Sequence, residues 1–351
     1  MSRGPTTLRV VGRFGFVGLC AALVLSACGS STPATVAQRV GGVPSISLSV
    51  PLSAVACTAT NTCIAVGTSV TSVGPTSVGE VRAPTGGWTS IATPSAVQST
   101  NITTSSCWST GCLFGGQSPS GDVFWLYDAT AQTVTAVTVP PNSLGVNGIS
   151  CYATLSCAVV DDVKSVAPRF LTTTDGGVTW TTHSPLVMPA SEQVSAFTCA
   201  TALSCMTVGS FQNGVTVYVT SDGGSTWSVR TTLNTSTWSQ LTSLSCQHAA
   251  CVGLADLESG WHVVRTKNFG KSWKRGGVVK SLSYLACASV ESCVAAGQND
   301  QTSDTPWIAT VDSSTVTPLR LTYVPSGIIS VSCGKKICAA IGNTTVMALR
   351  P

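Results

Sequence analysis

The sequence predicts an all-β fold built from one unit that is repeated seven times along the chain. Three observations support this prediction. Only 9% of the 351 residues are charged, and the prevalence of Thr, Ser, Val, Ala and Gly favours strands and turns over helices. Cysteines recur in seven regularly spaced pairs, and residues 194–232 contain one complete unit of four short strands.

Residues 194–232 show how one unit is built. A first strand ends at Cys199, and a five-residue turn leads to a second strand at Cys205. A glycine-containing turn precedes the β-branched third strand 215–220, and a turn around Asp222 leads to the fourth strand. Four antiparallel strands in about forty residues are typical of one blade of a β-propeller. The sequence therefore predicts a seven-bladed β-propeller of four-stranded antiparallel blades over residues 44–351.

The N-terminal residues predict export. Three arginines precede the apolar stretch 14–25, and small residues follow it, as in a signal peptide of residues 1–27. The stretch is too short for a typical membrane-spanning helix. The sequence Leu25-Ser26-Ala27-Cys28 resembles a bacterial lipobox, which implies that Cys28 is lipidated. An ordinary secretory signal with a chance cysteine is the alternative. Residues 28–43 are small and polar and predict a flexible tether. We expect localisation at the outer face of a bacterial plasma membrane.

The charge of the mature chain excludes one class of partner. After removal of residues 1–27, 15 basic residues remain against 14 acidic ones, and no continuous basic run is present. Nucleic-acid binding would need a basic footprint, so no nucleic-acid partner is expected.

The cysteine pairs predict one disulfide per blade. First cysteines recur after 41 to 50 residues, and four or five residues separate the members of each pair. Facing positions of a tight hairpin lie close enough for a disulfide after small local adjustment, and an exported protein meets an oxidising environment. Zinc would need four ligands per site, so no metal or cofactor is expected. The predicted disulfides are Cys57–Cys63, Cys107–Cys112, Cys151–Cys157, Cys199–Cys205, Cys246–Cys251, Cys287–Cys293 and Cys333–Cys338.

The turn between the third and fourth strands carries the pattern Ser/Thr-x-Asp-x-Gly-x-Thr/Ser-Trp. Its key positions are Asp175, Gly177 and Trp180; Asp222, Gly224 and Trp227; and, in a variant copy, Asn268, Gly270 and Trp273. The pattern resembles the Asp-box, or BNR, repeat of sialidases, sortilin-type propellers and photosystem II assembly-factor propellers. A structural role is expected, because Asp caps backbone N–H groups, Gly takes a positive φ, and Trp packs between sheets.

The two ends of the chain are predicted to close the ring. The last repeat ends one strand short, whereas residues 44–50 provide a surplus strand before the first cysteine pair. We expect this N-terminal strand to become the outer strand of the last blade, which leaves no open end.

Functional residues are expected on the face opposite the disulfides, where propeller ligands usually bind. One interpretation pairs Asp161 or Asp162 with Asp256 or Asp300 for glycoside hydrolysis and stacks Trp238 on a sugar ring. The other leaves these carboxylates solvated and packs Trp238 between blades.

The arginine pattern argues against a true sialidase. Sialidases use an arginine cluster with a Tyr–Glu nucleophile pair, yet no arginine of the domain lies on a predicted innermost strand. The Asp-box marks fold rather than function. The sequence therefore predicts a monomeric, lipid-anchored, non-catalytic binding or scaffold module for a protein or envelope glycan, with a glycoside hydrolase as the alternative.

Overall fold

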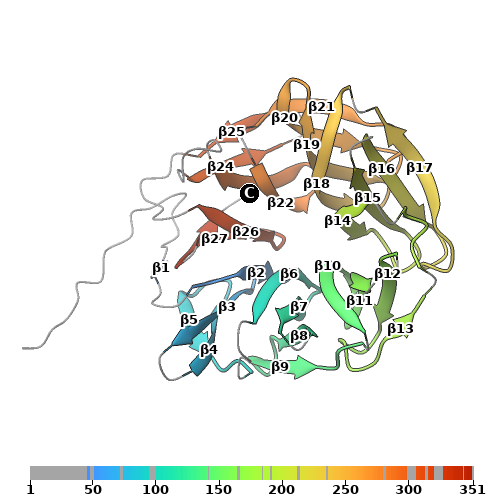
Figure 1. Cartoon of the computed structure of the whole chain (residues 1–351). Coiled ribbons are helices and arrows are strands. Elements are labelled where there is room, and N and C mark those ends of the chain that lie inside the picture. Colours follow the sequence, from blue (N-terminus) through green and yellow to red (C-terminus); the bar gives the residue numbers. More distant parts are fainter. Residues whose placement is uncertain are drawn as a thin grey trace, which may run out of the picture. The chain divides into compact units, whose positions relative to one another are not determined.

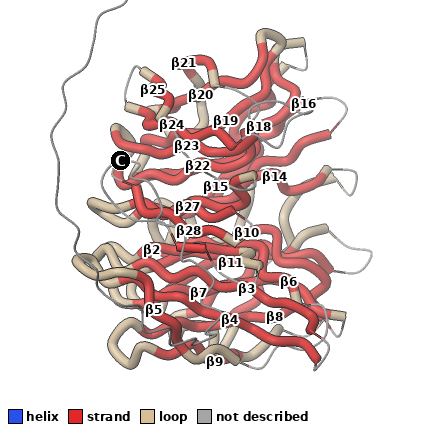
Figure 2. The backbone as a smooth tube through the Cα atoms, turned by 90° about the vertical axis from the view of Figure 1, so that its left-hand side faces the viewer, coloured by secondary structure: helices blue, strands red, loops and turns tan. Residues whose placement is uncertain are grey.

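A computed structural model of the chain describes residues 46–47 and 51–349, except residues 72–73, 95–99, 120, 141, 164–166, 184, 190–191, 212–213, 235, 280–281, 299–305, 313–314, 320–326 and 343. The predicted signal peptide, Cys28 and the predicted tether lie outside this part. The described chain consists of strands and loops (Figure 2). It contains no helix with the length and apolar character needed to cross a membrane.

The strands form seven four-stranded antiparallel sheets, one per blade, around a common centre (Figure 1). The predicted all-β, seven-bladed propeller is confirmed. In blades 1 to 6 the four strands follow one another from the innermost strand outward.

The strand bounds follow the cysteine spacing. Blade 1 contains β2 (Ala54–Cys57), β3 (Cys63–Thr71), β4 (Gly74–Arg82) and β5 (Trp88–Ile91). Blade 2 contains β6 (Asn101–Cys107), β7 (Gly111–Ser118), β8 (Gly121–Asp128) and β9 (Thr133–Val137). Blade 3 contains β10 (Ser143–Ala153), β11 (Ser156–Val163), β12 (Arg169–Thr173) and β13 (Thr181–Thr182). Blade 4 contains β14 (Gln193–Cys199), β15 (Cys205–Phe211), β16 (Gly214–Thr220) and β17 (Ser228–Leu233). Blade 5 contains β18 (Trp238–Gln247), β19 (Ala250–Leu257), β20 (Gly260–Thr266) and β21 (Lys274–Val278). Blade 6 contains β22 (Leu282–Ser289), β23 (Ser292–Gln298), β24 (Pro306–Val311) and β25 (Val316–Pro318).

Blade 7 joins both ends of the chain, as predicted. It combines β26 (Ile328–Cys333), β27 (Cys338–Gly342) and β28 (Thr345–Leu349) with the N-terminal strand β1 (Ile46–Ser47). Ile46 lies opposite Val346, and Ser47 lies opposite Thr345. The short β1 therefore covers the outer edge of β28 and closes the ring.

Each blade contains one disulfide at its first hairpin. In all seven hairpins the antiparallel register places the two cysteines directly opposite each other, for example Cys151 and Cys157. The seven disulfides join the predicted partners. The spacing of the cysteines therefore predicted both the length of the blade repeat and the disulfide partners.

The described hydrophobic core consists of seven clusters, one at each junction between neighbouring blades. Strand β19 shows how a single strand serves two clusters. Val252 and Leu254 pack toward blade 6, whereas Cys251 and Ala255 pack toward blade 4. Successive side chains of a strand point to opposite faces. Since both faces of the sheet are covered, the second strands are apolar on both sides.

Hydroxyl groups on the innermost strands connect neighbouring blades. At three junctions the serine before one cysteine accepts a hydrogen bond from the backbone N–H of the cysteine in the next blade. These bonds join Cys57 to Ser332 at 2.9 Å, Cys151 to Ser106 at 2.9 Å, and Cys199 to Ser150 at 2.8 Å. The first of them crosses the closure between blades 7 and 1.

The third-to-fourth turns around Asp175, Asp222 and Asn268 are built around their own side chains. Asp222 accepts hydrogen bonds from the backbone N–H of Thr226 at 2.9 Å, from its hydroxyl at 2.5 Å, and from the Thr220 hydroxyl at 2.7 Å. Gly224 takes a φ of 91°, and Trp227 packs edge-on against Phe170 of the preceding blade. The turn thus places an aromatic contact between neighbouring blades.

Candidate functional site

The two ends of the ring differ in the turns they carry. In blades 2 to 5 the third-to-fourth turn donates a backbone hydrogen bond to the disulfide-bearing loop of the same blade, as from Gly223 to Leu203 at 3.0 Å. Both sets of turns therefore lie at one end, which we call the disulfide face. The second-to-third turns and the links between blades form the opposite face. The predicted functional residues in the described part of the chain belong to strand ends and links of this opposite face.

Asp161 is fully buried and forms an ion pair with Arg169. The Arg169 Nη2 atom lies 2.7 Å from Asp161 Oδ2, and its Nε atom lies 2.9 Å from Oδ1. Arg169 also donates to the hydroxyl of Ser143 at 2.7 Å, and that hydroxyl donates to Asp161. These contacts join the starts of β10 and β12 to the end of β11. Asp161 therefore serves the packing of blade 3 and is not exposed to a substrate.

Asp122, at the start of β8, joins this group and was missed by the sequence analysis. Its side chain is only 5% exposed, and neither carboxylate oxygen has a hydrogen-bond partner within the described residues. Burial, followed by the negative charge of Asp161, raises the pKa of Asp122 to about 6. Ser143 opposes this rise only in part, since its single proton goes to Asp161. No local sequence pattern pointed to Asp122, because its neighbours come from the next blade.

The other predicted carboxylates lie outside this buried group, although the charge of Asp162 adds slightly to the rise in the pKa of Asp122. Asp162 is exposed and accepts a hydrogen bond from Asn147 Nδ2 at 2.8 Å. Asp256 is half-buried near the end of β19 in blade 5, which blade 4 separates from Asp161 and Asp162 in blade 3. Asp300 lies outside the described residues.

A buried Tyr–Glu pair was also missed. Tyr218 on β16 donates a hydrogen bond to Glu192 at 2.7 Å, and its side chain is 2% exposed. Burial and this hydrogen bond raise the pKa of Tyr218 above its usual value. A nucleophile needs the opposite shift together with access to a substrate. This pair therefore connects blade 4 to the preceding link and does not resemble an activated nucleophile.

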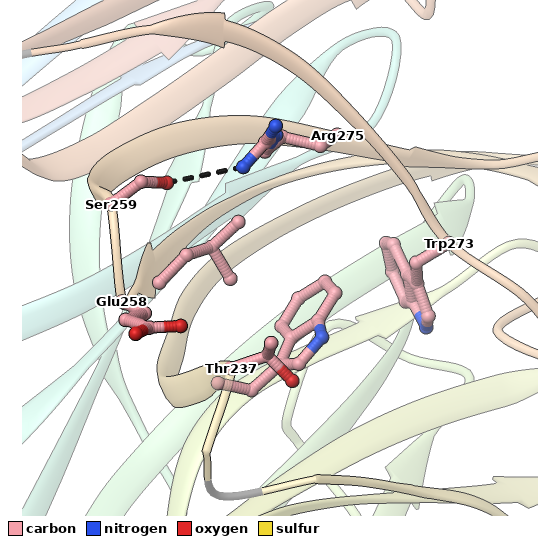
Figure 3. Close-up of a pocket in the computed structure, with 7 residues that line it drawn as sticks. Thr237, Glu258, Ser259, Trp273 and Arg275 are labelled. Atoms are coloured by element: carbon pink, nitrogen blue, oxygen red, sulfur yellow. Dashed lines mark hydrogen bonds between the residues drawn. The ribbon is translucent and has the colours of Figure 1, made fainter.

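Trp238, the first residue of β18, lines a cavity of about 510 Å³ whose lining residues belong to blade 5 and the link before it. The cavity is also lined by Thr237, Leu257, Glu258, Ser259, Trp273 and Arg275. Figure 3 shows Glu258 and Ser259 on one side and Trp273 on the other, with Arg275 hydrogen-bonded to Ser259 at 3.2 Å. Leu257 and Ser259 lie at the end of the β19–β20 hairpin that is distant from Cys251, so this part of the cavity belongs to the opposite face.

The structure shows one of the two roles that the sequence left open for the indole of Trp238, packing between blades. The indole packs edge-on against Trp273 with ring centroids 6.4 Å apart, and both rings adjoin the apolar cluster between blades 4 and 5. It is half-buried and also faces the cavity. Exposed Glu258 and Arg275 add one charge of each sign. Such a site can contact an apolar or ring-shaped group and orient it through polar contacts.

Within the described residues, no group of three or more His, Cys, Asp or Glu side chains could hold a metal ion.

Comparisons with known proteins agree on the fold. No protein-family model and no curated protein matches the sequence. A solved structure of YCF48 bound to a D1 peptide has a TM-score of 0.61 at 12% identity, covering 90% of this chain and 99% of that chain. The β-propeller domain of Cps50 (Swd1) from Myceliophteria thermophila has a TM-score of 0.58 at 12% identity, covering 86% and 98%. The GH74 xyloglucanase from Xanthomonas campestris has 0.57 at 8% identity, covering 89% of this chain and 53% of that chain.

The likeness shows a β-propeller. At such low identity it says nothing about activity, since one fold carries many functions. The function has to be argued from the residues of this chain.

Proposed function

We propose that this chain is a non-catalytic binding module whose ligand, a peptide segment of a protein or an envelope glycan, binds the cavity around Trp238. The carrying observation is the composition of that cavity. Two indole rings, one arginine and one glutamate line it, together with two hydroxyl groups. Glycoside hydrolysis generally needs two carboxyl groups facing the scissile bond, whereas Glu258 is the only carboxylate among the described lining residues.

The proposal includes the setting predicted from the N-terminal residues. The chain would be exported as a bacterial lipoprotein, anchored through Cys28 outside the plasma membrane, with the Asp-box turns as structural elements of its propeller. The YCF48 structure bound to a D1 peptide supports a peptide ligand by analogy of fold. The lipobox resemblance of residues 25–28 supports the anchor.

Binding can be tested on peptide and glycan arrays with the purified protein. The matched variants are Glu258→Gln/Arg275→Gln, which removes both charges of the cavity, and Lys335→Gln, which removes an exposed charge in blade 7. We expect array ligands of the wild type to lose about tenfold or more in affinity to the first variant, since each charge-assisted hydrogen bond contributes roughly 1.5–3 kcal/mol. Equal binding by the wild type and the cavity variant would refute this site.

A second candidate function, glycoside hydrolysis, is favoured by one observation. The carboxyl of Asp122 has a pKa raised to about 6 and lies beside the Asp161–Arg169 pair, and two carboxyls with separated roles are typical of glycosidases. Both side chains are buried, which argues against substrate access. Turnover in a fluorogenic glycosidase panel that disappears in Asp122→Asn would establish the enzyme; absence of turnover supports the binding module.

A further inference from the structure

A second cavity, lined by residues of blades 4 and 5, lies on the disulfide face beside an unusual concentration of positive charge. Five of the chain's 18 lysines and arginines fall within residues 265–275. The corresponding turns around Asp175 and Asp222 contain no cationic residue. Two of the five serve other purposes: Arg265 donates to the backbone oxygens of Val290 and Asp312, and Arg275 lines the cavity of the opposite face.

The three remaining cations are exposed and have no acidic partner among the described residues. Lys267, Lys271 and Lys274 lie in or directly after the third-to-fourth turn of blade 5. None of them forms an ion pair with a residue in the described part of the chain. Mixed surface charges usually neutralise one another, so this turn produces a local positive potential that attracts anions.

The adjacent cavity, of about 470 Å³, has a lining rich in hydrogen-bond donors. Arg230 and His248 contribute to it, and so do the hydroxyls of Thr201, Ser204, Thr220, Ser221, Thr226 and Ser228. Arg230 Nη2 donates to the backbone oxygen of Asn268 at 3.4 Å, the same oxygen that accepts the backbone N–H of Lys271 at 3.3 Å. The guanidinium of blade 4 is thereby held against the lysine-bearing turn of blade 5.

Several of these hydroxyl donors are free to bind a ligand. Ser204, Ser221 and Ser228 have no side-chain hydrogen bond to any described residue. Thr201 only accepts hydrogen bonds, from the backbone N–H groups of Leu203 and Ser204, so its own proton is available. The carboxylate of Asp222, next to the lining residue Ser221, already accepts three hydrogen bonds within its own turn.

We propose that this cavity binds a phosphate ester group, and that Lys267 and Lys271 contact further phosphates of the same anionic ligand. A phosphate presents several oxygen acceptors in a tetrahedral arrangement, which suits a guanidinium surrounded by hydroxyls. A planar carboxylate would satisfy fewer of these donors. The site lies on the face opposite the Trp238 cavity and does not depend on the function proposed there.

Isothermal titration with inositol hexakisphosphate tests the site on the purified protein. We expect binding by the wild type, and an affinity loss of about tenfold or more in Arg230→Gln and in Lys267→Gln/Lys271→Gln. The matched control Lys335→Gln/Lys336→Gln removes two exposed lysines from the disulfide-bearing hairpin of blade 7 and should stay within about twofold of the wild type. Ser221→Ala/Ser228→Ala should also weaken binding while leaving all charges in place.

Two further probes separate the source and the chemistry of the ligand. If a lipid headgroup supplies the phosphate, the protein should bind vesicles of phosphatidylcholine with phosphatidylglycerol, and inositol hexakisphosphate should release it from them. If the protein binds only the soluble probe, the ligand is a soluble phosphate ester. Polyglutamate should bind weakly. Three results would overturn the proposal. Polyglutamate could bind as tightly as the phosphate probe, or the control pair could lose as much affinity as the site variants. The folded wild type could also fail to bind the phosphate probe.

Discussion

The turns of the disulfide face and the cluster around Asp122 on the opposite face place the same side chain in two contrasting environments. Asp175 and Asp222 are turned toward their own backbone, and hydrogen bonds from Thr179 and Thr226, respectively, lower each pKa to about 2. Asp122 is buried, its neighbour Ser143 donates its proton to Asp161, and burial raises the pKa of Asp122 to about 6. Hydrogen-bond donors, rather than exposure alone, separate the two cases.

The difference gives the aspartates of the two ends opposite effects on stability as the pH changes. The turns of the disulfide face stabilise the fold at any pH above about 4 and lose this contribution as pH falls toward 2. The Asp122 cluster acts in the opposite sense, because charging a buried carboxyl without donors weakens the fold. The two ends of the ring should therefore respond to pH in separate windows.

The largest expected effect comes from breaking the ion pair of the Asp122 cluster. Arg169→Met would leave Asp161 buried and unpaired beside Asp122, which is expected to cost about 3–5 kcal/mol of unfolding free energy. Urea denaturation at pH 7 measures this loss. The double variant Asp161→Asn/Arg169→Met removes both charges and should recover much of it. If the single variant loses less than about 1 kcal/mol, the cluster is better solvated than its burial indicates.

The next largest effect is expected from a substitution that probes how tightly the turns of the disulfide face are packed. A Cβ atom at Gly224 would lie 2.2 Å from the ring of Phe170 in the preceding blade, at a φ of 91°. Gly224→Ala should therefore cost about 2–4 kcal/mol through overpacking and backbone strain. Gly260 is the matched control on the opposite face, since it has a φ of 97° and nothing within 4 Å of a Cβ. Gly260→Ala should cost only about 1 kcal/mol, due to backbone conformation alone. Equal losses in the two variants would show that the turn tolerates movement.

The sequence predicted those features of the fold that recur from one blade to the next. Cysteine pairs such as Cys199 and Cys205 mark the same hairpin in every blade, so their spacing predicted the blade count and the disulfides. The strand at Ile46 could be predicted because the last repeat lacked its fourth strand. Such features depend on local periodicity, which a single chain displays directly.

The sites could be predicted only in part, because residues from separate strands and turns combine to form them. Asp122 meets Arg169 across a junction, and no spacing in the sequence indicates which strand ends face each other. The predicted candidate Trp238 does line a cavity, but its partners Trp273 and Arg275 come from the outermost strand and the turn before it. The lysine cluster of blade 5 was missed by a search for basic runs, since other residues separate Lys267, Lys271 and Lys274.

The last prediction concerns the pH range in which Asp122 affects the stability of the fold. Its folded pKa, about 6, lies above the usual value near 3.8. The neutral form therefore stabilises the fold fully below about pH 4, and this contribution is lost as pH rises through about 6. Asp122→Asn keeps the neutral form at every pH. Urea denaturation from pH 4 to 7.5 should show equal stability at the acidic end and a gain of about 1–3 kcal/mol for the variant above pH 6.

A nearby carboxylate provides the control for that gain. Asp162→Asn removes one exposed negative charge from the end of β11, so an equal gain in this variant would attribute the effect to net charge rather than to burial of Asp122. A variant Asp122→Asn that is less stable than the wild type at pH 7.5 would mean that its carboxylate is paired in solution. In that case the contrast between the two faces would disappear, because hydrogen-bond donors would stabilise the charged aspartates on both of them.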